Sequence, residues 1–148
     1  MTHTVRFHRV LKAPPERVYR AFTTAQAMCK WLPPHGFTGE MHQMEVRVGG
    51  EWRMSFTNLS TQAVHSFGGQ YLELEFGRFL RYSSRFDDPN LRGEMITTVQ
   101  LRSVFCGTEM EVTQEGIPEL IPPEACHLGW QESLLLLTQL VEPDIPNG

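Results

Sequence analysis

In four segments between residues 50 and 114, apolar and polar side chains alternate with a period of two, which constrains the fold more than any other feature of the sequence. In residues 50–57 the two faces are Trp52, Met54 and Phe56 against Glu51, Arg53 and Ser55. In residues 79–87 they are Leu80, Tyr82, Ser84 and Phe86 against Arg81, Ser83 and Arg85. This period is typical of antiparallel strands that have one covered face and one face in water. The chain therefore needs a sheet with a wide apolar face and an element that covers it.

One predicted helix, from about residue 123 to residue 141, is long enough to cover that face. Its apolar stripe consists of Trp130, Leu134, Leu137 and Val141. Leu135 and Leu136 lie off this stripe and need other contacts. In a monomer Leu136 would stay partly in water, so we predict that Leu136, together with Leu32 or the short helices, forms a homodimer contact.

The other elements follow from changes of period and from turn residues. Residues 4–10 read as a first strand, and two short helices follow at about 14–22 and 24–31, before Pro33 and Pro34. The remaining strands are predicted at Thr38–Glu45, Gly50–Asn58, Ala63–Glu75, Phe79–Asp87, Glu94–Val104 and Thr108–Gln114. The fold class is α+β, with the helices on one side of a strongly curved antiparallel sheet. Residues 1–142 are expected to form one domain, and residues 143–148 a flexible tail.

Composition and charge exclude several classes of function. The net charge of −4 gives no electrostatic basis for binding nucleic acid or an anionic membrane. No apolar run is long enough to be inserted in a membrane, and the first ten residues lack the apolar core of a signal peptide, which predicts a cytoplasmic location. The three cysteines and six histidines show no metal-ligand spacing, so we expect no metal and no cofactor.

Six segments together resemble one known family. They are APPERVYRAFTTAQAMCKWL at 13–32, VRVGGEWRM at 46–54, GQYLELE at 69–75, RFLRYSSRF at 78–86, GTEMEVTQEG at 107–116 and GWQESLLLL at 129–137. The sequence resembles the START-like (SRPBCC, Bet v-type helix-grip) superfamily, and within it the activator of heat-shock-protein-90 ATPase homologue-like branch. The resemblance implies a curved sheet that grips the C-terminal helix, with a hydrophobic cavity between them. The name of the branch also implies a chaperone partner and a role in the stress response.

The inward face carries more large aromatic side chains than a small core requires, so a ligand-binding cavity is predicted there. Its expected lining is Trp31, Trp52, Met54, Phe56, His65, Tyr82, Phe86, Thr97, Gln114, Trp130 and Leu134. The alternative is that the same residues fill a closed core. Gly68 and Gly69 are expected to form a β-bulge that changes the register, which leaves the direction of His65 open.

Three functions remain open: a carrier of a small hydrophobic molecule, a co-chaperone-like interaction module, and a cyclase- or hydrolase-type enzyme. A cavity of several hundred Å3 would favour the carrier. A large exposed apolar patch would favour the interaction module. Two acid–base groups that converge in the cavity would favour the enzyme. No G-x-S-x-G motif or phosphate-binding loop is present, so no catalytic residue is predicted and the carrier is preferred.

Overall fold

The computed structural model describes residues 2–147, and residues 1 and 148, the ends of the predicted domain and tail, lie outside the described residues. The strands are β1 (His3–Leu11), β2 (Phe37–Met44), β3 (Glu51–Asn58), β4 (Val64–Glu75), β5 (Phe79–Phe86), β6 (Met95–Val104) and β7 (Gly107–Ile117). The helices are α1 (Pro15–Thr23), α2 (Ala25–Trp31) and α3 (Pro123–Val141). The predicted elements are therefore confirmed, although β7 runs on to Ile117, beyond its predicted end at Gln114.

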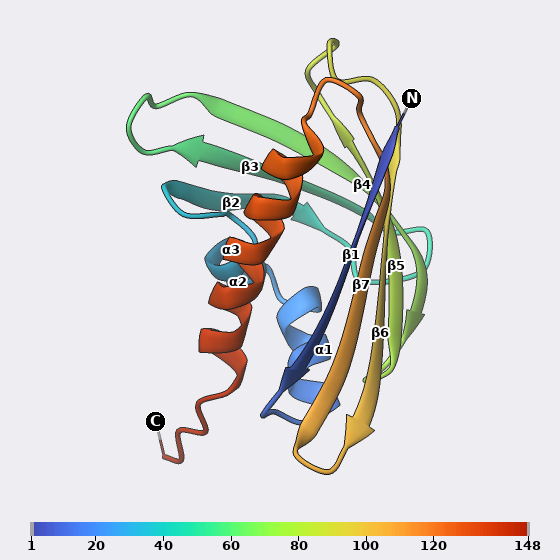
Figure 1. The fold of residues 1–148 in the computed structure, drawn as a ribbon, viewed down its shortest axis with the longest axis vertical. Helices are drawn as coiled ribbons and strands as arrows, with labels where there is room; N and C mark the ends of the chain where they lie inside the picture. The colour runs from blue at the N-terminus through green and yellow to red at the C-terminus, as the bar shows by residue number, and fades with distance from the viewer. Residues whose placement is uncertain (1, 148) are drawn as a thin grey trace.

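The strands form one antiparallel sheet in the order β1-β7-β6-β5-β4-β3-β2. Strands β2 to β7 follow one another as a meander, and β1 pairs with β7 at the other edge. The sheet curves around α3, and α1 and α2 lie beside α3 within the same concave side (Figure 1). The predicted α+β helix-grip fold is confirmed. Within residues 2–147, no helix combines the length and the apolar character that crossing a bilayer requires.

The two glycines in β4 have a different role from the predicted one. The register between β3 and β4 runs through Gly68 and Gly69 without a shift, and the irregularity in β4 lies between Tyr71 and Glu73. The predicted bulge at the glycines is therefore wrong. A Cβ atom at Gly69 would overlap with the carbonyl oxygen of Ser83 on β5, so glycine is needed because the neighbouring backbone comes so close.

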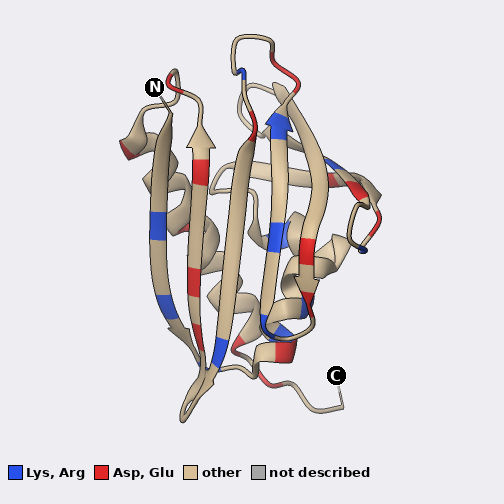
Figure 2. Cartoon of the chain, turned by 90° about the vertical axis from the view of Figure 1, so that its right-hand side faces the viewer, with Lys and Arg blue, Asp and Glu red and all other residues tan. Residues whose placement is uncertain are grey.

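The outer face of the sheet carries the charges, as the alternation predicts (Figure 2). Arg102 on β6 faces Glu109 on β7, and their side chains form an ion pair with Nη2 and Oε1 2.6 Å apart. Ser55 was predicted to lie on this wet face in water, but it is buried, and its hydroxyl is hydrogen-bonded with His42 and Ser66. Exposed ion pairs contribute only about 0–1 kcal/mol each, so this face adds little to stability.

The predicted stripe of α3 is buried against the sheet and the short helices: Trp130, Leu134, Leu137 and Val141. Leu136 is partly buried and packs against the core, whereas Leu135 is 50% exposed. Leu136 thus stays partly in water, as predicted, but within residues 134–137 the most exposed leucine is Leu135. The predicted homodimer stays a prediction.

The leucine run provides a matched stability test. Leu137 is 0% exposed, so we expect Leu137→Ala to lower the free energy of unfolding by about 2–5 kcal/mol through lost burial and a residual cavity. Leu135→Ala should change it by about 0.5 kcal/mol or less, because Leu135 lies at the surface. Urea denaturation of both variants measures this difference, and similar losses would contradict the packing of α3.

Candidate functional site

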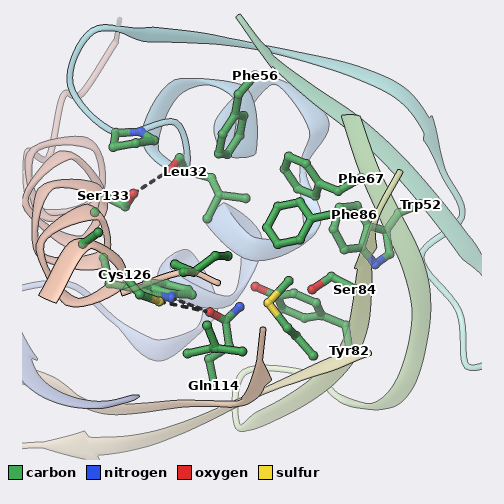
Figure 3. Close-up of a pocket in the computed structure, with 17 residues that line it drawn as sticks. Leu32, Trp52, Phe56, Phe67, Tyr82, Ser84, Phe86, Gln114, Cys126 and Ser133 are labelled. Atoms are coloured by element: carbon green, nitrogen blue, oxygen red, sulfur yellow. Dashed lines mark hydrogen bonds between the residues drawn. The ribbon is translucent and has the colours of Figure 1, made fainter. Parts of the chain in front are cut away.

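A cavity of about 180 Å3 lies between α3, the concave face of the sheet and the segment that follows α2 (Figure 3). The sheet contributes inward-facing residues of β3 to β7. α3 contributes the face that includes Cys126, Gly129, Trp130 and Ser133. These positions recur at intervals of three and four residues, which places them on one side of a helix. The cavity is thus formed by the two elements that the sequence predicted to face each other.

The predicted lining residues divide into three groups. Six of them line the cavity: Trp52, Phe56, Tyr82, Phe86, Gln114 and Trp130. Four others are buried in the core and are not part of the lining: Trp31, Met54, Thr97 and Leu134. His65 is exposed, although its partner across the strands is the lining residue Phe56. His65 faces the same side as Phe56 but lies beyond the edge of the cavity.

The structure adds lining residues that were not predicted. Leu32 and Pro34 come from the segment after α2, Ile117 is the last residue of β7, and Ile121 comes from the connection between β7 and α3. No periodic pattern marks such connecting segments. Further additions lie on strands and on α3: Phe67, Ser84, Met95, Ala125, Cys126, Gly129 and Ser133. The alternation in the sequence already predicted that Ser84 points inward. Phe67 would also have been predicted to point inward if no bulge had been assumed at Gly68 and Gly69.

Aromatic rings packed edge to face form one wall. The ring of Phe67 lies 4.8 Å from that of Phe56, 5.6 Å from that of Trp52 and 6.0 Å from that of Phe86, measured between centroids. Such geometries add about 0.5–1.5 kcal/mol per pair beyond the burial of area. Phe67 is therefore at the centre of this wall, and its contacts hold the neighbouring rings in fixed orientations.

Gln114 connects three elements on the opposite wall. Its Oε1 accepts a hydrogen bond from Trp130 Nε1 at 3.0 Å, and its Nε2 donates to Thr97 Oγ1 at 3.1 Å. Thr97 is in turn hydrogen-bonded with the hydroxyl of Tyr82. The amide on β7 thus ties α3 to β6 and, through Thr97, to β5. These polar groups are satisfied by one another, as buried polar groups require.

The lining is electrically neutral. It includes no Asp, Glu, His, Lys or Arg among the residues that the structure describes. Burial raises the pKa of the Tyr82 phenol, since desolvation disfavours the phenolate, and the hydrogen bond with Thr97 only partly opposes this effect. Burial also raises the pKa of the Cys126 thiol. Both groups are therefore protonated near pH 7. No three His, Cys, Asp or Glu residues within 2–147 are grouped so that they could hold a metal ion.

The bond between Gln114 and Trp130 can be tested by a double-mutant cycle. Gln114→Leu should lower the free energy of unfolding by about 1–3 kcal/mol, because it leaves the buried indole N–H without an acceptor. In a Trp130→Phe background the same change should cost less, by about 0.5 kcal/mol or more. Chemical denaturation of the four proteins measures this coupling, and strictly additive losses would show that the bond contributes nothing.

The buried phenol of Tyr82 predicts a loss of stability at alkaline pH. Above about pH 10 the unfolded chain releases the phenol proton, whereas the folded chain keeps it because its pKa is raised. The unfolded state then binds fewer protons, so the free energy of unfolding falls as the pH rises. Tyr82→Phe should reduce this slope by up to about 1.4 kcal/mol per pH unit. Urea melts between pH 8 and about pH 11.5 measure it, and equal slopes in both proteins would refute the prediction.

Known proteins with this fold support the assignment of the family. The model of the activator of Hsp90 ATPase homolog 1-like protein family matches residues 12–142. Protein CV1439 from Chromobacterium violaceum shows 54% sequence identity, over 95% of this chain and 98% of its own, and a TM-score of 0.94. No curated protein matches the chain significantly.

Two more distant structures share the fold. Protein NE0264 from Nitrosomonas europaea has 19% identity over 94% of each chain, with a TM-score of 0.80. The AHSA1-like protein from Aeromonas hydrophila has 20% identity over 95% of this chain and 92% of its own, with a TM-score of 0.74. The resemblance found in the sequence is thereby confirmed, and the chain belongs to the family of activator of Hsp90 ATPase homolog 1-like proteins.

Proposed function

We propose that this protein binds, and so carries, a small hydrophobic molecule in the cavity between α3 and the sheet. The observation that carries this proposal is Gly129, which lies within α3 and lines the cavity. A Cβ atom at this position would meet no atom within 4 Å. Glycine inside a helix costs about 1 kcal/mol relative to alanine. The chain therefore bears a cost in helix stability at a position where a side chain would occupy the cavity.

The volume of the cavity limits the size of the ligand. Pockets for drug-sized molecules measure about 300–1,000 Å3, whereas an engineered cavity of about 150 Å3 accommodates benzene. At about 180 Å3, the cavity is smaller than the several hundred Å3 that the sequence analysis expected of a carrier. A molecule of one aromatic ring with a short substituent fits it. The proposed ligand is therefore small and compact.

Two alternative roles of the cavity residues, a closed core and an enzyme active site, have less support. A closed, fully packed core would leave few spaces larger than a water molecule, which does not describe this cavity. Acid–base catalysis needs titratable groups with pKa values near the working pH. The described lining offers only Tyr82 and Cys126, and burial raises the pKa of both groups. Binding without chemistry agrees better with this lining.

Contact with a protein partner is a second candidate function. Leu128 and Leu135 are about two turns apart on α3. Leu128 is 56% exposed and Leu135 is 50% exposed. They provide an apolar surface for a chaperone, which the family description suggests, or for a second copy of the chain. Two leucines cover little area compared with a specific protein interface, so we rank this function below ligand binding. A cytoplasmic location is part of both proposals.

Filling the cavity from α3 tests the carrier function. We expect the wild-type protein to bind toluene, and Gly129→Leu to weaken this binding at least about tenfold, because the new side chain occupies the ligand space. Gly129→Ala is the matched control: it should raise the free energy of unfolding by about 1 kcal/mol and leave most of the binding intact. NMR titration and urea melts measure the two effects. Equal affinities of the wild type and Gly129→Leu would contradict a ligand in this cavity.

A further inference from the structure

Ser84 differs from every other polar residue in the cavity wall. It lies on β5 between Tyr82 and Phe86 along the inward face, and its side chain projects toward the cavity (Figure 3). The residue is only 4% exposed. Its hydroxyl nevertheless makes no hydrogen bond with any residue that the structure describes. Ser84 therefore presents an unused polar group to a largely apolar space.

The other polar groups of the wall already have partners. Gln114 accepts from Trp130 and donates to Thr97, as described above. Ser133 Oγ on α3 donates to the carbonyl oxygen of Leu32 at 2.6 Å. The hydroxyl of Tyr82 is hydrogen-bonded with Thr97. Among these wall residues, the hydroxyl of Ser84 is thus the one that remains available to a molecule in the cavity.

The neighbouring residue Ser83, on the same strand, has a hydrogen-bond partner for its hydroxyl. Ser83 is also 4% exposed, but it faces the outer side of the sheet. Its Oγ accepts a hydrogen bond from the backbone N–H of Gln70 at 3.0 Å. The hydroxyl of Ser84 has no such partner and is open to the space of the cavity. Two adjacent serines with equal exposure therefore differ in one respect: the partner of Ser84 has to come from the cavity.

We infer that Ser84 selects an uncharged ligand that carries one hydroxyl or carbonyl group, which pairs with Ser84 Oγ while the rest of the molecule contacts the aromatic wall. This inference rests on the proposed carrier function and deepens it. A serine hydroxyl both donates and accepts, so it suits either group. The neutral lining offers no cation for a carboxylate and no anion for an amine. A charged ligand would lose its hydration without a charged partner, which is strongly unfavourable.

Three probes share one ring and one methyl group: toluene, p-cresol and p-toluate. Comparing them separates the effects of the apolar contact, of the hydrogen bond with Ser84 and of a charge on the ligand. The wild-type protein should bind p-cresol more tightly than toluene, and p-toluate at least tenfold more weakly than p-cresol. Ser84→Ala should weaken p-cresol binding about three- to tenfold, the range expected for one hydrogen bond between neutral groups, and should change toluene binding less than about twofold. Calorimetric or NMR titrations at pH 7 give these ratios.

Ser83→Ala is the matched control, because it removes an equally buried hydroxyl from the outer face. It should leave the affinity for p-cresol unchanged. If both serine variants weaken p-cresol equally, or if Ser84→Ala weakens toluene as much as p-cresol, the role of Ser84 is overturned while the carrier function stands. If p-toluate binds as tightly as p-cresol, the restriction to neutral ligands is overturned. If none of the probes binds the wild type, the inference and the carrier function both fail.

Discussion

The packing of α3 against the concave face of the sheet is the contact on which the rest of this structure depends. Within the curved sheet, Gly69 on β4 lies so close to the carbonyl group of Ser83 on β5 that a Cβ atom would not fit there. The concave side of the sheet holds α3 (Figure 1), and the apolar stripe of this helix is buried there through Leu134, Leu137 and Val141. Toward the start of α3 the stripe gives way to smaller residues, and there the space stays open as the cavity.

The fold could be predicted from the sequence because apolar residues recur with a period of 2 in the strands and of 3.6 in the helices, and both periods can be recognised in the sequence itself. Turn residues then set the bounds of the elements within a few positions. The details that failed depend on contacts between strands. The bulge expected at Gly68 and Gly69 lies instead near Leu72, and the expected wet residue Ser55 is buried and hydrogen-bonded with His42 and Ser66. Neither contact follows from the local pattern.

The candidate site was less predictable, for a physical reason. Alternation shows which side chains point inward, but it does not show which of them meet a space and which meet another side chain. Trp31 and Trp52 are both large, aromatic and buried, yet Trp31 packs on Phe22 in the core whereas Trp52 lines the cavity. The residues missed from connecting segments, such as Leu32 and Ile121, reach the cavity only because distant parts of the chain meet there.

Gly129 and Ser84 lie on opposite sides of the cavity and point to the same conclusion by independent routes. Glycine within α3 lowers helix stability, and alanine would fit the open space at that position. The hydroxyl of Ser84 faces the cavity and has no hydrogen-bond partner among the described residues. A wall that served only as core would be more stable with alanine in place of Gly129 and would need no polar group at the position of Ser84. An open position on α3 and an unpartnered hydroxyl on β5 agree better with a site that accepts a molecule than with a core that is imperfectly filled.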